Sequence, residues 1–196
     1  MDGKAQGEFK QKEFKIAISG KSGCGNTTVS RTVAEKLGLR FINFTFRTLA
    51  EERGITLKDV LEKAAKDDSW DLEVDRRQAA IAREGGGCVL GSRLAIWMLP
   101  EADLKVYLCA RQETRVKRIM RREGGNLKDI TAFTAERDRQ DRERYLRIYQ
   151  IDNDDYNFAD LAIDTDDLSP DEIVLLILNA ARAAHAGTGR TKTDKE

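Results

Sequence analysis

The sequence predicts an α/β fold in which helices cover both faces of a five-stranded parallel sheet. Five short apolar runs alternate with segments of helical periodicity, which indicates strands joined by helical crossovers. Such strands pair in parallel, because each helix must cross back over the sheet before the next strand begins. The length of 196 residues fits one domain with a sizeable core. Ligands of such sheets bind at the carboxyl ends of the strands.

The expected elements follow in chain order. Strands are predicted at 14–19, 40–44, 88–90, 104–109 and 160–163, and helices at 27–37, 46 to about 84, 111–123 and 130–150. The last helix has the clearest start, since Ser169, Pro170 and Glu172 occupy the N-cap, first and third positions of a capping box. Residues 1–12 and 186–196 are polar and contain glycine, which is typical of flexible tails and leaves 13–185 as the single domain.

The composition excludes several classes of site and partner. The 34 lysines and arginines balance 34 acids, which argues against a nucleic-acid binder. The one histidine, His185, falls in the soft C-terminal region, so histidine triads and multi-histidine metal sites are not expected. Cys24, Cys88 and Cys109 form no paired motif, which favours a reducing cytoplasm. No apolar run approaches the roughly 20 residues of a membrane span, and the N-terminus is unlike a signal peptide.

The neutral total combines two blocks of opposite charge. Residues 111–147 hold twelve basic and seven acidic side chains, whereas residues 152–172 hold nine acids and no lysine or arginine. Acids interspersed in the first block weaken its positive field, so RNA binding there is the least favoured hypothesis.

A glycine-rich loop follows the first expected strand and leads into a helix. It matches the phosphate-binding P-loop pattern G-x-x-x-x-G-K-[ST] at its two glycines and at Thr27. Glycines let backbone N–H groups surround phosphate oxygens, and the following helix N-terminus adds partial positive charge. The Thr27 hydroxyl is the candidate ligand for Mg²⁺. The candidate residues for binding the phosphates of ATP are Gly20, Lys21, Ser22, Gly23, Cys24, Gly25, Asn26, Thr27 and Thr28.

The loop departs from this pattern at the lysine that reaches the β- and γ-phosphates. Asn26 stands there, and it is too short and uncharged to neutralise phosphoryl charge as an ammonium group does. Lys21 comes just after the first glycine, as in some ATPases with deviant P-loops, where such a lysine accompanies the usual one. We hypothesise that Lys21 supplies part of the missing charge, within its own chain or across a dimer. The alternative is a solvated loop lysine.

Arginines stand where a phosphate-binding cleft would need them. Arg47 follows the second expected strand, and Arg93 ends the third. Arg137, Asp141 and Arg144 are spaced i, i+4, i+7 and therefore share one helical face. Guanidinium groups bind phosphate bidentately and stay charged, whereas a carboxylate accepts hydrogen bonds from a sugar or a base. This face is expected to close over a nucleotide, and the alternative is a solvated face of ion pairs.

Five further motifs follow the P-loop along the chain. They are FTFRTLAEERG (44–54), VDRRQ (74–78), SRLAIWML (92–99), ERDRQDRERY (136–145) and DTDDLSPDEIV (164–174). Together, from about residue 14 to 184, they resemble cytidylate kinases of the nucleoside monophosphate kinase group, in the compact archaeal-type form. The resemblance implies a three-layer P-loop NTPase fold with two insertions, a monophosphate-binding region at about 44–84 and a lid at about 111–150.

The resemblance also implies an activity and a set of roles. The reaction is the Mg²⁺-dependent transfer of the ATP γ-phosphoryl group to CMP or dCMP, giving CDP and ADP. Lys21, Arg137 and Arg144 are the expected catalytic residues. We expect a monomer that binds neither nucleic acid nor membrane, although the sequence leaves a dimer open. The residues implied to bind CMP are Arg47, Arg77, Arg93, Arg137, Asp141 and Arg144, with a purely structural role as the alternative for Arg77.

A second departure lies at the end of the third strand, where family members often have an acidic residue. Gly91 and Ser92 stand there, so no carboxylate is available to organise the metal and its waters. Asn26 and Gly91 together leave open a non-catalytic nucleotide-binding protein, a pseudokinase. A kinase for another small acceptor, such as shikimate or dephospho-coenzyme A, is the third hypothesis.

Overall fold

The five expected strands are confirmed. The computed structural model describes residues 13–190, and in this part of the chain the strands form one sheet in the order β2-β3-β1-β4-β5. All neighbouring strands are parallel. Each strand lies within two residues of its expected bounds. The strands are β1 (Lys15–Gly20), β2 (Arg40–Ile42), β3 (Cys88–Gly91), β4 (Leu104–Cys109) and β5 (Leu161–Asp164).

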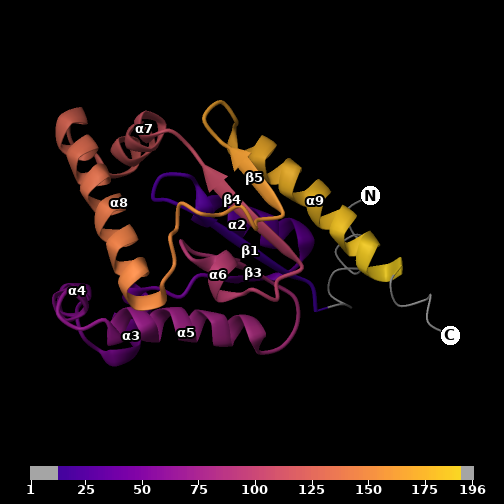
Figure 1. Ribbon diagram of the computed structural model, residues 1–196, viewed down its shortest axis with the longest axis horizontal. Helices are drawn as coiled ribbons and strands as arrows, with labels where there is room; N and C mark the ends of the chain where they lie inside the picture. The colour runs from indigo at the N-terminus through magenta and orange to yellow at the C-terminus, as the bar shows by residue number, and fades with distance from the viewer. Residues whose placement is uncertain (1–12, 191–196) are drawn as a thin grey trace.

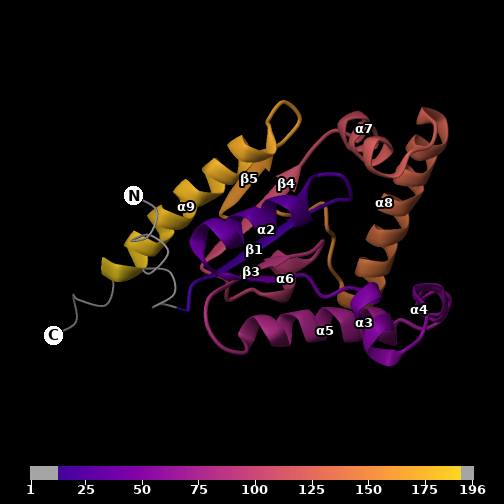
Figure 2. The same ribbon diagram turned by 180° about the vertical axis from the view of Figure 1, so that it is seen from behind.

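Helices cover both faces of this sheet, as the sequence predicts. Helices α2 (Asn26–Leu37) and α9 (Pro170–Arg190) pack on one face, and α5 (Ser69–Arg83) and α6 (Ala95–Met98) pack on the other (Figure 1; Figure 2). Side chains of β1 pack against both helical layers, because successive side chains of a strand point to opposite faces of the sheet. Ile16 and Ile18 belong to the core under α2 and α9, whereas Ala17 belongs to the core under α5 and α6.

The helical segment expected from Phe46 to about Glu84 is divided into three helices. They are α3 (Phe46–Arg53), α4 (Leu57–Ala64) and α5. Gly54 ends α3 with a φ of 63°, and Thr45 and Thr56 begin α3 and α4 with capping boxes. These three short helices lie beside the foot of α8 (Leu127–Tyr149), so the 44–84 segment forms one wall of a cleft near the carboxyl ends of β2 and β3 (Figure 1).

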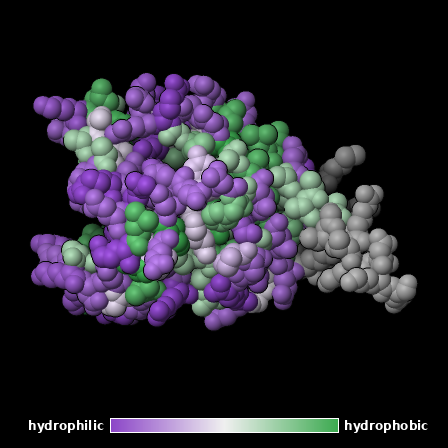
Figure 3. All heavy atoms as spheres, in the orientation of Figure 1, coloured by the Kyte–Doolittle hydropathy of each residue, from purple (hydrophilic) through white to green (hydrophobic). Residues whose placement is uncertain are grey.

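The segment 111–150 forms a helical hairpin of α7 (Gln112–Glu123) and α8. Gly124 and Gly125, both with positive φ, separate the two helices. Helix α8 begins three residues before the expected Ile130, because the Asn126 side chain accepts a hydrogen bond from the Asp129 backbone N–H. Hydrophilic side chains predominate over α8, in keeping with its alternating arginines and acids (Figure 3).

The C-terminal prediction was wrong at two points. Helix α9 continues to Arg190, so residues 186–190 are helical, whereas 1–12 and 191–196 lie outside the described residues. His185 is not in a soft tail: it is 8% exposed, and its ring packs edge-on against Phe14 with centroids 5.6 Å apart. The three cysteines form no disulfide. Over residues 13–190, none of the helices has both the length and the apolar character that crossing a membrane requires.

Candidate active site

The expected phosphate loop lies between β1 and α2, at the carboxyl edge of the sheet (Figure 1). Gly23 and Gly25 adopt φ values of 88° and 99°, which residues with side chains rarely adopt. Thr27 and Thr28 are exposed in the first turn of α2, where the partial positive charge of the helix N-terminus favours an anion. The positive-φ glycines and the helix N-terminus are the features on which the prediction of phosphate binding rests.

Asn26, which replaces the usual P-loop lysine, closes the loop on itself. Its Nδ2 donates to the carbonyl oxygen of Gly20 at 2.7 Å. Its Oδ1 is buried and accepts no hydrogen bond within the described part of the chain. A Cβ at position 20 would lie 2.8 Å from this Oδ1 and 2.4 Å from the carbonyl oxygen of Leu108, so the close approach requires glycine. Asn26 thus stabilises the shape of the loop and adds no charge.

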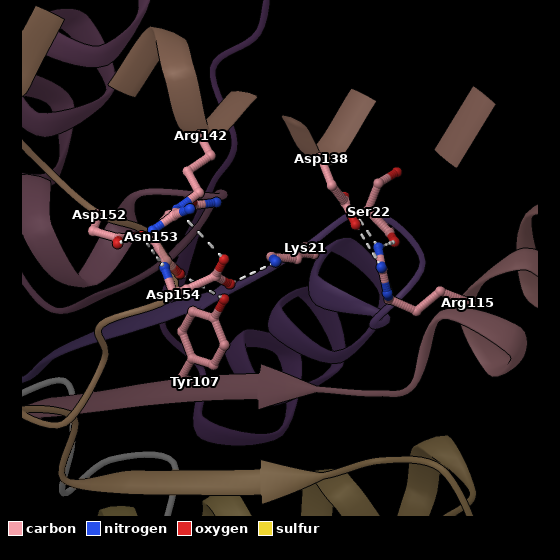
Figure 4. A network of polar contacts seen from close by, with 9 residues as sticks. All are labelled: Lys21, Ser22, Tyr107, Arg115, Asp138, Arg142, Asp152, Asn153 and Asp154. Carbon is pink, nitrogen blue, oxygen red and sulfur yellow. Dashed lines mark hydrogen bonds and ion pairs between the residues drawn. The ribbon is translucent and has the colours of Figure 1, made fainter. Parts of the chain in front are cut away.

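Lys21 points away from the loop glycines, toward the segment that joins α8 to β5. Its Nζ lies 2.5 Å from Asp154 Oδ1 (Figure 4). Arg142 of α8 donates to Asp152 of the same segment at 2.5 Å and lies 3.8 Å from Asp154. The Lys21 side chain is 25% exposed, so the ammonium group is held in an ion pair near the surface of the protein.

A cavity of about 570 Å³ opens beside the loop, a volume typical of small-ligand sites. Its polar side is formed by arginines from α3, α7, α8 and the loop after β3, and its apolar side by residues of the 44–84 segment. Helix α5 adds two carboxylates and one amide to the lining. The lining arginines are Arg47, Arg93, Arg122, Arg137 and Arg144; the apolar residues include Phe44, Phe46, Leu57, Leu61 and Val74; the α5 residues are Asp71, Asp75 and Gln78.

A buried carboxylate orients two of these arginines. Asp141 is 6% exposed, and its Oδ1 accepts a hydrogen bond from Arg144 at 2.8 Å while its Oδ2 lies 3.3 Å from Arg93 Nε. Arg144 Nε lies 3.2 Å from Asp71. Burial raises the pKa of Asp71 to about 6, against the opposing effect of Arg144. Asp141 therefore positions Arg93 and Arg144, and it does not itself line the cavity.

Two cavity arginines have no carboxylate of their own. Within residues 13–186, neither Arg47 nor Arg137 forms an ion pair with an acid. Burial and the nearby charge of Arg93 lower the pKa of Arg137. A half-buried guanidinium without a counter-ion favours the entry of an anion, because the incoming charge relieves the repulsion among the arginines.

The structure does not bring Arg77 to the cavity. Its guanidinium donates to Glu52 of α3 at 2.5 Å and lies 4.6 Å from the centre of the Phe44 ring. Arg77 therefore joins α5 to α3, which is the structural alternative that the sequence left open. Four of the five arginines expected to bind CMP do line the cavity: Arg47, Arg93, Arg137 and Arg144.

The packing around Gly91 explains why no acidic residue stands at the end of β3. A Cβ at this position would lie 2.5 Å from Ser30 Oγ and 2.7 Å from Ser30 Cβ, because α2 packs directly on the strand. No acidic side chain fits there unless the helix moves. The next residue, Ser92, lines the cavity with a buried hydroxyl that forms no hydrogen bond in the described structure.

The donor set suits a magnesium ion that arrives with phosphates. No group of three or more histidine, cysteine or acidic side chains in residues 13–186 could hold a metal ion. Magnesium usually keeps several waters and takes few protein ligands where phosphates supply the rest. The exposed Thr27 hydroxyl at the start of α2 fits that requirement as one oxygen ligand.

A second cavity, of about 770 Å³, lies on the other side of the loop. It is bounded by α7 and by the segment that joins β5 to α9. Gly23, Gly25 and Thr28 of the loop line it, together with Arg118 and Arg122 of α7. Gly23, Gly25 and Thr28 line both cavities, as does Arg122, so the cavities meet at the phosphate loop.

Residues 15–167 match the cytidylate kinase-like family. The chain belongs to this family. It is 48% identical over 168 residues to cytidylate kinase 2 of Borrelia garinii subsp. bavariensis, covering 84% of this chain and 94% of that protein. It is 39% identical over 184 residues to cytidylate kinase of Pyrococcus furiosus, covering 92% and 95%. Shikimate kinase from Acinetobacter baumannii, solved with shikimate, shares the fold with a TM-score of 0.65 at 19% identity, covering 91% and 97%.

Membership of the cytidylate kinase-like family confirms the resemblance drawn from the motifs and makes the chain a nucleoside monophosphate kinase, a phosphotransferase. The sequence reasoning missed Arg118 and Arg122. Their i, i+4 spacing on the helix after a strand was the available signal, since it places both on one face of α7. That face borders the phosphate loop.

Proposed function

We propose that the protein is a cytidylate kinase, which transfers the γ-phosphoryl group of ATP to CMP, with dCMP as a second acceptor. The observation that carries this proposal is one cavity lined by the phosphate loop, by five arginines and by apolar residues of the 44–84 segment. The names of the relatives that match over most of the chain support it. A coupled assay of ADP release with ATP and CMP tests it.

The two cavities fit a donor and an acceptor that meet at the loop. ATP would place its phosphates on residues 20–28 and its nucleoside in the cavity beside α7, near Arg118. CMP would occupy the first cavity, with its phosphate held by Arg47, Arg93 and Arg137. No general base is required, because the acceptor phosphate is already anionic near neutral pH.

Stabilising the transferred group is the task of the cationic side chains. Arg137 and Arg144 lie on the face of α8 that lines the cavity, where they can spread charge from the phosphoryl group as it moves. Mg²⁺, when bound with ATP, neutralises phosphate charge, and Thr27 would hold it together with waters. We take α7 and α8 as the lid, whose closure would exclude water from the two substrates.

Replacing Lys21 by alanine tests whether it supplies the charge that Asn26 lacks. If the ammonium leaves Asp154 for the phosphates of ATP, we expect kcat to fall about 100-fold, the usual effect of removing one donor to a developing charge. Asn26→Lys in the same chain is expected to restore activity. Steady-state kinetics with ATP and CMP measure both effects.

Two further results decide the role of Lys21. Lys36→Ala, at an exposed position of α2, is the matched control and should leave kcat unchanged. If Lys21→Ala retains full activity, the ion pair with Asp154 is the whole function of this lysine.

Gln78 offers a basis for choosing cytosine over uracil. Its Nε2 donates to Asp75 Oδ1 at 2.7 Å, and Asp75 Oδ2 accepts a hydrogen bond from the Tyr149 hydroxyl at 2.6 Å. This arrangement fixes the amide, so Oε1 is left as an acceptor; it is buried on the cavity wall with no partner in the described structure. The 4-amino group of cytosine donates a hydrogen bond, whereas O4 of uracil only accepts one.

We therefore expect Gln78→Leu to lower the ratio of kcat/KM for CMP to kcat/KM for UMP about 10- to 100-fold, the effect of one buried hydrogen bond of about 1–3 kcal/mol. Kinetics with both monophosphates measure this ratio. Gln140→Leu, at an exposed position of α8, is the control. An unchanged ratio in Gln78→Leu would assign the choice of base to other residues.

A further inference from the structure

Every carbonyl group of the first four residues of the phosphate loop accepts a hydrogen bond. Gly20 accepts from Asn26 Nδ2 at 2.7 Å, and Lys21 accepts from the Cys24 N–H at 3.1 Å. The donors to the next two carbonyls come from outside the loop. Arg115 donates to the Ser22 carbonyl at 3.1 Å, and Arg118 donates to the Gly23 carbonyl at 3.5 Å.

The carbonyl partners set the direction of the loop N–H groups. In a trans peptide, C=O and N–H point in opposite directions, and the described chain contains no cis peptide bond. Arg115 therefore fixes the Gly23 N–H when it binds the Ser22 carbonyl. Gly23 lines both cavities, so a peptide group held by Arg115 adjoins the space proposed for the phosphates of ATP.

Arg115 itself lines neither cavity. It is 5% exposed and forms two hydrogen bonds with Asp138 of α8, at 3.1 and 2.5 Å (Figure 4). Its backbone packs directly on the loop, because a Cβ at Gly23 would lie 2.8 Å from Arg115 Cβ and 3.0 Å from Arg115 Cα. One guanidinium group thus joins α7, α8 and the phosphate loop.

Asp138 lies on the helix that forms the acceptor side of the cavity. It follows Arg137 directly and precedes Asp141 by about one turn, so a movement of α8 that brings arginines to the acceptor also moves Asp138. A buried ion pair is weak evidence for stability, since a well-packed apolar pair of similar volume is often as stable. Here the guanidinium of the pair also binds the Ser22 carbonyl of the phosphate loop, and this third partner indicates a positioning role.

We propose that Arg115 and Asp138 are positioning residues that couple the acceptor site to the phosphate loop. When α8 is drawn to the acceptor phosphate, Asp138 orients Arg115, and Arg115 fixes the Ser22–Gly23 peptide for the ATP phosphates. Binding of CMP therefore strengthens binding of ATP, and the reverse holds to the same extent. This inference rests on the proposed function, because it takes CMP as the acceptor.

The test compares the full chain with a double variant, Arg115→Met and Asp138→Leu, which replaces the pair with apolar side chains. Calorimetric titration measures the Kd of a non-hydrolysable ATP analogue with Mg²⁺, with and without saturating CMP. In the unmodified protein we expect CMP to lower this Kd at least 5-fold, within the usual range of coupling between sites. In the double variant we expect the ratio of the two values to fall to 1 and KM for ATP to rise. The Kd of CMP without ATP should stay unchanged, whereas KM for CMP at saturating ATP should rise by the factor of coupling that is lost, because the coupling is reciprocal.

The matched control replaces a pair that lies on α8 but faces solvent. Arg139 and Glu143 are 2.6 Å apart, with side chains 55% and 59% exposed, and Arg139→Met with Glu143→Leu should keep the coupling. If the first double variant does not fold, Asp138→Asn, which keeps the shape of the side chain, carries the same measurements. Coupling and KM for ATP that match the unmodified protein in the variant would overturn the proposal.

The outcome for the unmodified protein separates this inference from the proposed function. If it phosphorylates CMP and the variant keeps normal coupling, the inference fails and the function stands. If the unmodified protein does not phosphorylate CMP, the proposed function fails. The Kd of the double variant for the ATP analogue alone then decides whether Arg115 positions the phosphate loop. We expect this affinity to be weaker than in the unmodified protein, and an unchanged affinity would contradict the positioning role.

Discussion

Replacing Arg144 by methionine is expected to lower kcat/KM for CMP by about 100- to 1,000-fold, the range seen when one group that stabilises developing charge is removed. Arg144 lines the acceptor cavity, and Asp141 and Asp71 hold its guanidinium in place at 2.8 and 3.2 Å. The variant loses a cation and also leaves these two buried carboxylates without the charge of Arg144. Steady-state kinetics with varied CMP measure the loss.

The same helix supplies the control for Arg144. Arg147 pairs with Asp68 at 2.6 Å, its side chain is 59% exposed and it does not line the cavity. Arg147→Met should therefore change kcat/KM less than about 2-fold, since exposed ion pairs contribute little. Equal losses in the two variants would mean that Arg144 acts only by stabilising α8. Activity close to that of the unmodified protein in Arg144→Met would remove it from the site.

Adding a single methyl group at Gly91 is expected to lower the free energy of unfolding by about 1–3 kcal/mol, the usual effect of overpacking a core. The Cβ of Gly91→Ala would lie 2.5 Å from Ser30 Oγ, and the exposed surface of Ser30 is 0%. Helix α2 must then move from β3, and with it the phosphate loop that precedes the helix. Urea denaturation followed by circular dichroism measures the change.

A second substitution separates steric overlap from other causes of this loss. Ser30→Gly removes the two atoms nearest to the new methyl group, so the double variant should recover much of the stability that Gly91→Ala loses. A Gly91→Asp variant that folds as well as the unmodified protein would contradict the account of the missing acid. In that case, the site could hold the carboxylate that family members often have.

The site residues could be predicted where the sequence determines both the place of a residue in the fold and the side of the sheet to which it belongs. Arg47 and Arg93 follow the ends of parallel strands, which meet at one edge of the sheet, and both reach the cavity. Residues on α5 were harder to assign, since helical spacing does not tell which face points to the ligand. Arg77 and Gln78 are neighbours, yet Gln78 lines the cavity whereas Arg77 pairs with Glu52.

Contacts between distant segments could not be predicted from local patterns. Arg115 and Asp138 meet because Gly124 and Gly125 turn α7 back along α8. Asp138 lies within the 136–145 motif, but nothing in that motif indicates Arg115 as its partner. The sequence identifies Asn26 as a position where the usual P-loop lysine is absent. Its hydrogen bond to the Gly20 carbonyl depends on the curvature of the folded loop, which the spacing of glycines does not specify.

The most direct test of the proposed function is a coupled assay of ADP release with ATP and Mg²⁺ over CMP, dCMP, UMP and AMP. We predict ADP release that depends on CMP, with a higher kcat/KM for CMP than for UMP or AMP, from the chain with Asn26 in its phosphate loop. Absence of release with every monophosphate, while a non-hydrolysable ATP analogue still binds, would contradict it and indicate a nucleotide-binding protein without kinase activity.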